Sequence, residues 1–240
     1  MCGRYAFFTP LQAVARLFGA EESAAGDFAP RYNIAPTQQV PIVRWSAPDE
    51  GDTSASSLRM LSMARWGLVP FWAKDPAIGN RMINARGETV SHKPAYRAAF
   101  RRRRCLVPAD GFFEWQQCSS GKQPWFIRAA AGQPLALAGL WETWSPDDGE
   151  PLHSCTIITT AANGFMRPLH DRMPVILDAA GREAWLDRAA SPDTLQAVLV
   201  PAPDDALEAW PVSRRVNRPA NDDAALLEPV PAGQSISPGA

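Results

Sequence analysis

The most reactive residue type in this chain stands at its second position, in the opening Met1-Cys2-Gly3-Arg4-Tyr5. Removal of Met1 would leave Cys2 with a free α-amino group beside its thiol. An amine condenses with an aldehyde to an imine, and a thiol held this close then closes a five-membered thiazolidine ring. The ordinary pKa values, about 7.7 to 8.0 for the amine and about 8.5 for the thiol, make both groups partly nucleophilic near neutral pH. Position alone does not separate such an aldehyde trap from an N-terminal cysteine without a role.

Further candidates for chemistry stand in five segments that mix polar residues and proline with strongly apolar neighbours, which is unlike plain strands. These segments are Arg31 to Thr37, Trp66 to Trp72, Ile83 to Arg86, Gly111 to Trp115 and His170 to Pro174. Glu114 lies between two aromatic residues, and such an apolar cradle raises a carboxyl pKa toward neutrality. By residue type alone, Glu114 also fits a surface carboxylate, His170 a histidine satisfied by its neighbours, and Asn84 a turn cap.

The framework that must position these segments is dominated by strands. Short β-like runs occur at 40–45, 58–66, 105–107, 125–128, 135–144, 154–160 and 173–177. Thr9-Pro10, the apolar spacing that follows and Gly19 predict an amphipathic helix, and helical patterns recur over 95–103, 182–188 and 194–200. Because the helices do not alternate with the strands, we expect an α+β fold with a mainly antiparallel, barrel-like sheet and flanking helices. Trp66 is expected in the core, and most other tryptophans are expected in or near it.

Length and composition fit one domain over residues 1–230, followed by a disordered tail over 231–240. The polar stretch 46–57 predicts a surface loop. No run of about 18 apolar residues is present, so we expect no membrane association and a cytoplasmic location. The cysteines, Cys2, Cys105, Cys118 and Cys155, show no CxxC pair and no zinc-like spacing, so neither a metal site nor a disulfide framework is indicated.

The net charge of −1 argues against a protein that coats nucleic acid through bulk charge, but positive charge is concentrated in residues 58–104. The acidic residues of that stretch are only Asp75 and Glu88. A local anionic ligand and a solvated basic face both fit this pattern. For Arg101 to Arg104 we favour the solvated face, because these residues end a predicted helix, where cations complement the macrodipole.

Together with the opening pentapeptide and the late segment Pro211 to Asn217, the five polar segments closely resemble, in the same order, the SOS response-associated peptidase (SRAP) family of abasic-site processing proteins. The resemblance extends from residue 2 to about residue 230. It implies an SRAP-like single domain that binds single-stranded DNA and forms a covalent link to an abasic site through Cys2, which protects the lesion. It also implies strand cleavage of the lyase type and autoproteolytic exposure of Cys2.

Carried over by motif, the resemblance makes Cys2 the nucleophile, Asn84 a positioning group, and Glu114 and His170 the pair that transfers protons. It implies that DNA is contacted by Arg4, Pro36, Phe71, Trp72, Arg86, Thr160 and Arg172. The arginines are expected on phosphates, and the proline and aromatic residues on the bases flanking the lesion. No cofactor is expected. The expected partner is single-stranded DNA containing abasic sites, and the expected state is a monomer.

Two other classes of function remain open from the residues. In a cysteine peptidase or N-terminal-nucleophile hydrolase, Cys2 would attack amides with the help of Glu114 and His170, although no further proteolytic constellation can be identified. In a non-covalent single-strand binder, Cys2 would be incidental and the basic segment would bind the strand. Substitution of Cys2 by alanine would then leave binding unchanged in kind.

Overall fold

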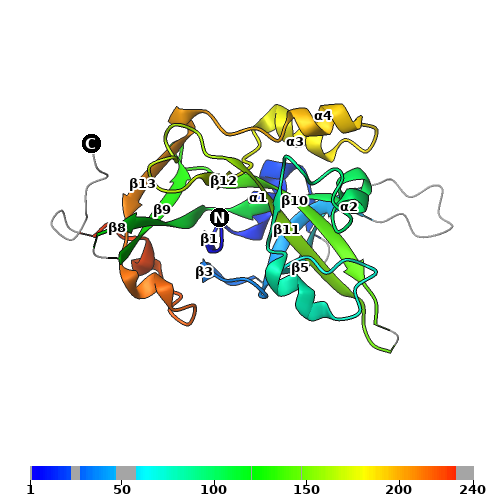
Figure 1. Cartoon of the computed structure of the whole chain (residues 1–240), viewed down its shortest axis with the longest axis horizontal. Helices are drawn as coiled ribbons and strands as arrows, with labels where there is room; N and C mark the ends of the chain where they lie inside the picture. Colours follow the sequence, from blue (N-terminus) through cyan, green and yellow to red (C-terminus); the bar gives the residue numbers. More distant parts are fainter. Residues whose placement is uncertain (1, 23–27, 47–57, 120, 147, 231–240) are drawn as a thin grey trace.

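The computed structural model describes residues 2–22, 28–46, 58–119, 121–146 and 148–230. Nearly all of the loop predicted at 46–57, and the whole tail predicted at 231–240, lie outside the described residues. Two β-sheets with flanking helices make up the described part of the chain (Figure 1). This arrangement confirms the predicted α+β fold.

The larger sheet closes into a five-stranded barrel. Its strands are β4 (Gln39–Trp45), β5 (Arg59–Trp66), β7 (Arg104–Ala109), β10 (Leu135–Trp144) and β11 (Leu152–Ala161). Neighbours pair antiparallel in the order β11-β10-β7-β4-β5, and a parallel pairing of β5 with β11 closes the circle. The short strands β6 (Asn84–Arg86) and β12 (Arg172–Pro174) continue along β11, and β2 (Glu21–Glu22) lies along β5. The predicted barrel-like sheet is therefore present.

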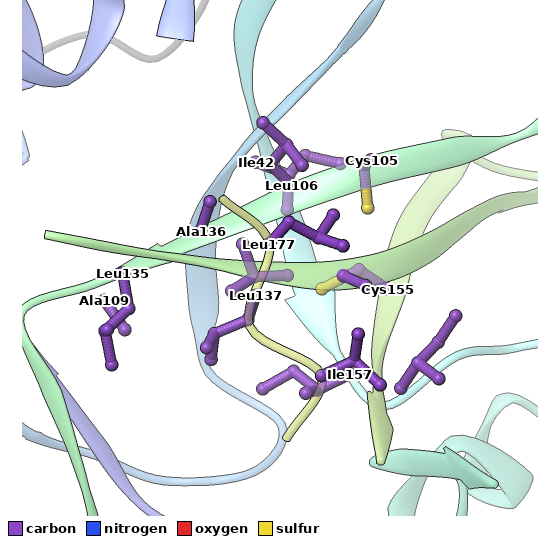
Figure 2. Close-up of a cluster of buried hydrophobic side chains, with 14 of the residues drawn as sticks. Ile42, Cys105, Leu106, Ala109, Leu135, Ala136, Leu137, Cys155, Ile157 and Leu177 are labelled. Atoms are coloured by element: carbon purple, nitrogen blue, oxygen red, sulfur yellow. The ribbon is translucent and has the colours of Figure 1, made fainter. Parts of the chain in front are cut away.

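Apolar side chains fill the barrel, as Figure 2 shows for residues of its core. Ile42, Val107, Leu137 and Ile157 come from four different strands, share one face of the sheet by register, and none is more than 1% exposed. Alternate residues of a strand point to the same face, so each barrel strand directs every second side chain inward. Trp66 at the end of β5 is fully buried, as expected.

The smaller sheet carries the start of the chain. Its antiparallel order is β13 (Leu207–Pro211), β9 (Gly121–Ala129), β8 (Gly111–Cys118), β1 (Tyr5–Phe7) and β3 (Arg31–Ile34). Strand β1 lies between β8 and β3, with Tyr5 opposite both Phe112 and Ile34. Strand β1 lies near the middle of the molecule in the view of Figure 1.

The helices follow their capping residues. The helix α1 (Leu11–Phe18) begins after Pro10 and ends at Gly19, which adopts a left-handed φ of 61°. Two predicted helices start earlier than expected because Asp178 and Ser191 accept hydrogen bonds from backbone N–H groups at their first turns. The remaining helices are α2 (Arg97–Arg102), α3 (Ala179–Leu186), α4 (Pro192–Ala197), and the 3₁₀ turns η1 (Pro76–Arg81), η2 (Asp204–Ala206), η3 (Arg214–Asn217) and η4 (Ala224–Leu227). Within the described ranges, none of the helices has the length and apolar character needed to cross a bilayer.

The polar segments are more regular than their composition predicted. Strands β3, β6 and β12 lie within three of them, and Gly111 to Trp115 forms the first half of β8. The sequence predicted that these segments are too polar for plain strands. That prediction was wrong because their buried polar side chains form hydrogen bonds with specific partners, which the sequence alone does not reveal. Asn33, for example, is fully buried and donates hydrogen bonds to the carbonyl groups of residues 216, 218 and 221.

The four consecutive arginines do not form one solvated face. Arg104 is only 5% exposed, and its guanidinium donates hydrogen bonds to the carbonyl oxygens of Phe100 and Arg101 at the end of α2. Arg103 forms an ion pair with Glu142 at 2.7 Å. Only Arg101 and Arg102 are exposed. Their side chains therefore differ in role from the buried Arg104, which caps the helix.

Candidate functional site

Strand β1 brings Cys2 beside Glu114. The N–H of Phe113 donates to the carbonyl oxygen of Arg4 at 2.9 Å, so the residues before Arg4 run antiparallel to the next part of β8. Cys2 is completely buried, and Glu114 is 2% exposed. Burial, and then the nearby negative charge of Glu114, raise the pKa of the Cys2 thiol. The two side chains thus share one buried environment.

The carboxyl group of Glu114 is suited to proton transfer at neutral pH. Burial raises its pKa to about 7, and the carboxylate of Asp171 adds a smaller increase. Phe113 and Trp115, its neighbours in β8, point to the opposite face of the strand and pack in a separate cluster, so they do not form the apolar cradle that the sequence predicted. Because a group with a pKa near the ambient pH exists in both protonation states, Glu114 can both donate and accept a proton.

Asn84 holds Cys2 from the other sheet. It lies at the start of β6, opposite Ile157 of β11, and its Nδ2 donates to the backbone oxygen of Cys2 at 2.8 Å. Its Oδ1 atom is buried and accepts no hydrogen bond from the described residues. The Asn84 side chain therefore fixes the backbone of Cys2 and keeps one acceptor available for an N–H group.

His170 approaches the same region in the loop before β12. Its Nδ1 lies 2.9 Å from the backbone nitrogen of Arg172 and 2.7 Å from Oδ1 of Asp171. Burial lowers the pKa of His170, which favours a neutral ring that accepts the N–H of Arg172. Gln116 of β8 donates to the carbonyl oxygen of Pro168 at 3.3 Å and ties this loop to the strand of Glu114.

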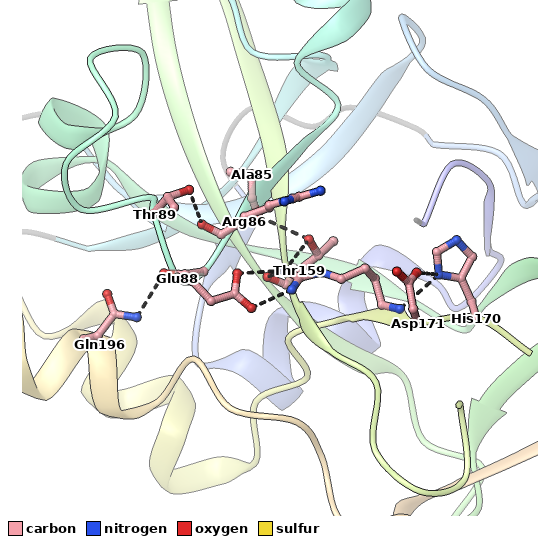
Figure 3. A network of polar contacts seen from close by, with 10 residues as sticks. Ala85, Arg86, Glu88, Thr89, Thr159, His170, Asp171 and Gln196 are labelled. Atoms are coloured by element: carbon pink, nitrogen blue, oxygen red, sulfur yellow. Dashed lines mark hydrogen bonds and ion pairs between the residues drawn. The ribbon is translucent and has the colours of Figure 1, made fainter. Parts of the chain in front are cut away.

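Figure 3 shows a polar network around β11 that includes Glu88 and Thr159, and Arg172 belongs to it through its hydrogen bonds to these two residues. Its two terminal nitrogens contact the carboxylate oxygens of Glu88 at 2.5 and 2.9 Å, and Nη2 also donates to the carbonyl oxygen of Thr159 at 2.7 Å. Arg86 on β6 is exposed, whereas Thr160 on β11 is 5% exposed. These residues lie on adjacent strands, but a phosphate at Arg172 would share the guanidinium with Glu88.

Arg4 is also engaged within the protein. Its Nη1 donates at 2.8 Å to Oδ1 of Asn33 and at 2.8 Å to the carbonyl oxygen of Val216, and its guanidinium lies 6.0 Å from the ring centre of Trp115. Sequence reasoning missed Asn33 and Glu88 as partners of the expected arginines. A signal for Asn33 was present, because it is an amide next to apolar residues within one of the recognised segments.

The residues expected on the bases are accessible. Phe71 is 60% exposed, Trp72 is 50% exposed, and Pro36 is half-buried. The turn that presents the two aromatic residues is tightly packed at its base, where Gly67 adopts a φ of 125° against the backbone of Gly79. Adjacent exposed aromatic rings on a fixed turn are suited to stacking against bases.

Comparison with known proteins identifies the chain. A family model described as SOS response associated peptidase (SRAP) matches residues 1–219. The chain belongs to the SRAP family. A curated relative, the abasic site processing protein YoaM of Bacillus subtilis, is 42% identical and aligns over 95% of this chain and 98% of its own. The abasic site processing protein HMCES of Gallus gallus is 35% identical over 87% of this chain and 68% of its own.

Solved structures share the architecture of this SRAP protein. An X-ray structure of a protein from Bordetella bronchiseptica superposes with a TM-score of 0.72 at 27% identity, covering 88% of this chain and 100% of that one. One from Bacteroides thetaiotaomicron reaches a TM-score of 0.84 at 24% identity, covering 95% of this chain and 100% of that one. The barrel and the smaller sheet are thus a shared fold.

The SRAP fold brings three of the expected catalytic residues, Cys2, Asn84 and Glu114, together at one site. The carboxylate of Asp171, next to His170, lies close enough to raise the pKa of Glu114, so the loop of His170 is near this site. The roles of these residues, and those of the expected DNA contacts, stay predictions. Across the described ranges, no three His, Cys, Asp or Glu residues gather as a metal site would require.

Proposed function

We propose that this SRAP protein is a sensor of abasic sites, which binds single-stranded DNA and captures the lesion covalently as a thiazolidine on Cys2 once Met1 has been removed. The observation that carries the proposal is that Asn84 holds the Cys2 backbone beside Glu114, a buried carboxyl with a pKa of about 7. The relatives named abasic site processing proteins support this class of lesion.

The proposed reaction begins with the open-chain form of the abasic deoxyribose, which carries an aldehyde at C1′. The α-amino nitrogen of Cys2 attacks C1′ to form a carbinolamine, and loss of water then gives an imine. The thiol sulfur adds to the imine carbon, and the S–H proton moves to the nitrogen. One water leaves for each aldehyde captured, and no oxidant, reductant or cofactor is consumed.

The neighbouring groups supply the proton transfers that these steps need. Glu114 protonates the departing oxygen of the carbinolamine and accepts a proton from the attacking amine, because burial keeps its pKa at about 7. His170, whose pKa is lowered mainly by burial, is neutral at the same pH, and because its Nδ1 accepts the N–H of Arg172, its Nε2–H is the group that can donate a proton. Asn84 orients the amine through the backbone of Cys2.

The environment of Cys2 favours an amine that attacks first over the thiolate of a cysteine peptidase. Burial raises the pKa of the Cys2 thiol, so the thiolate is rare near neutral pH. An imine needs only the neutral amine, and the thiol can lose its proton during ring closure. Protein residues and the aldehyde therefore suffice for the proposed trap.

Two further activities belong to the same proposal. At the imine stage the hydrogen on C2′ becomes acidic, so removal of that proton would expel the 3′ phosphate by β-elimination and cleave the strand. Closure of the thiazolidine competes with this lyase step. We also propose that the site itself removes Met1 by hydrolysis. Water attacks the carbonyl carbon of the Met1–Cys2 bond, and Glu114 takes the proton of that water and delivers it to the leaving nitrogen of Cys2, so intact mass would show Met1 retained in Glu114→Gln.

The proposed path of the DNA places the phosphates at Arg4, Arg86 and Arg172, with a hydroxyl contact from Thr160. The bases that flank the lesion stack on Phe71 and Trp72 and abut Pro36. The exposed aromatic rings and the exposed Arg86 support this path, since these side chains can contact a strand without rearrangement.

The test compares native protein with Cys2→Ala, both checked for loss of Met1 by intact mass. Each is mixed with a single-stranded oligonucleotide that carries one abasic site, and the products are separated on a denaturing gel with and without borohydride. Native protein should give a stable complex without reduction. Cys2→Ala keeps an α-amino group but lacks the thiol, so its complex should require borohydride to trap the imine.

The outcomes separate the alternatives. A borohydride-independent complex with Cys2→Ala would exclude the thiazolidine, and no complex under either condition with native protein would exclude covalent capture. Retained binding without any covalent product would favour a non-covalent single-strand binder. Cleavage of unrelated peptides by native protein but not by Cys2→Ala would favour a cysteine peptidase.

A further inference from the structure

A basic cavity lies between the exposed Phe71 and helix α2. Its volume is about 400 Å³, and it is lined by Phe71, Ala98, Arg101, Arg102, Arg103 and Glu142. We refer to it as the α2 cavity. A second cavity of about 270 Å³ shares Arg102 and Arg103 with it and continues past Trp45 and Trp141. The two cavities are therefore neighbours on either side of these arginines, and each has an aromatic side chain in its lining.

The fold holds the walls of the α2 cavity in place. Arg104 donates hydrogen bonds to the carbonyl oxygens of Phe100 and Trp185, both at distances below 3 Å, and so fixes the end of α2 against α3. Arg103 is held by its ion pair with the buried Glu142 of β10. Phe71 stands on the turn that follows β5. The concave shape therefore results from three anchored elements.

The charges in this cavity are not balanced within it. Glu142 is its acidic residue, and Arg103 already pairs with that carboxylate. The guanidinium groups of Arg101 and Arg102 make no hydrogen bond or ion pair with the described residues, and both side chains are exposed. Two available guanidinium forks beside an exposed aromatic ring match a nucleotide, which presents phosphate oxygens and a base to stack.

We propose that the α2 cavity binds the continuation of the same DNA strand, with Arg101 and Arg102 on consecutive phosphates past the base that stacks on Phe71. The inference rests on the proposed function, because it extends the strand from that lesion site. A solvated basic face would also leave Arg101 and Arg102 exposed. The concave wall shared with Phe71 distinguishes the two interpretations, since a merely solvated face needs no aromatic partner.

The test uses two oligonucleotides that carry a tetrahydrofuran abasic analogue, which has no aldehyde and cannot form the covalent link. One has the analogue at its 5′ end and the other at its 3′ end, each with about 12 nucleotides on the remaining side. Affinity is measured by fluorescence anisotropy across a range of salt concentrations. The variant is Arg101→Ala with Arg102→Ala, and the control of equal charge is Arg16→Ala with Arg97→Ala, which are exposed and lie outside the cavity.

One of the two oligonucleotides should lose affinity in the Arg101→Ala, Arg102→Ala variant. Each phosphate contact to a single strand contributes about 0.7 to the slope of log affinity against log salt concentration. For that oligonucleotide the slope of the variant should therefore be about 1.4 smaller than the slope of native protein. The ratio of the two affinities should accordingly shrink about 25-fold when the salt concentration rises tenfold. The other oligonucleotide and the control variant should stay unchanged. Equal losses on both oligonucleotides, equal losses in the control, or no loss at all would overturn the inference. Because the tetrahydrofuran analogue cannot react with Cys2, this binding test remains valid even if the protein forms no covalent link to an abasic site.

Discussion

Replacing Glu114 by glutamine should stabilise the protein at alkaline pH while it impairs the proposed chemistry. Burial raises the pKa of this carboxyl from 4.5 to about 7 in the folded protein, and the side chain is 2% exposed. Each pKa unit corresponds to about 1.4 kcal/mol. The folded state therefore resists ionisation of Glu114 by about 3 kcal/mol relative to the unfolded chain, and glutamine removes that cost while it preserves the shape of the side chain.

The sign of the effect follows from proton binding. Because the folded pKa lies above the unfolded value, the folded protein binds more protons between these two values, and stability decreases as pH rises through about 7. Below the unfolded pKa the carboxyl is neutral in both states and contributes no penalty. The advantage of Glu114→Gln over the native protein should therefore grow by about 2 to 3 kcal/mol between pH 5 and pH 8.

Urea unfolding at pH 5 and pH 8 measures this advantage, with the state of Met1 in each protein recorded by intact mass. Glu183→Gln is the control. A hydrogen bond from Arg59 lowers the pKa of Glu183, so loss of this charge should not stabilise the protein at pH 8. An advantage of Glu114→Gln that is the same at both pH values would refute the raised pKa.

The other predictions concern the groups around Glu114 and the turn that presents the aromatic residues. Asn84→Ala removes the hydrogen bond to Cys2, so it should slow cross-linking at saturating DNA while strand affinity, measured by anisotropy, changes little. Arg86→Ala should weaken binding to intact and abasic strands alike and flatten the salt slope; a loss confined to abasic strands would contradict a phosphate contact. Gly67→Ala places a Cβ 2.5 Å from the carbonyl oxygen of Gly79 at a φ of 125°, so thermal unfolding should show a loss of about 1 to 3 kcal/mol, and an unchanged melting temperature would refute the strain.

The strands of the barrel were predictable because they are long and apolar. The run at 135–144 coincides with β10, and the run at 154–160 lies within β11. The helix 11–18 was equally clear, since its apolar spacing ends at a glycine that adopts a left-handed conformation. These elements encode their structure locally, through periodicity and caps.

The smaller sheet and the ion pairs of the site could not be predicted in the same way. The three residues of β1 are too few for a periodic pattern, and they form a strand only because β8 and β3 lie on both sides. The pairing of Arg172 with Glu88 joins residues that are 84 positions apart. Such contacts depend on tertiary packing, which neither propensity nor spacing reports.

Trp66 connects the core to the site more closely than its burial alone indicates. The edge of its ring system packs on Tyr5, with ring centres 5.2 Å apart, and its Nε1 donates to the carbonyl oxygen of Ile83 at 2.9 Å. Tyr5 follows Cys2 by three residues in the smaller sheet, and Ile83 directly precedes Asn84 at the barrel. This buried side chain therefore bridges the two sheets near the point where Asn84 reaches Cys2. The geometry of the proposed trap is in this respect a property of the packing, since Asn84 belongs to the larger sheet and Cys2 precedes the strand β1 of the smaller one.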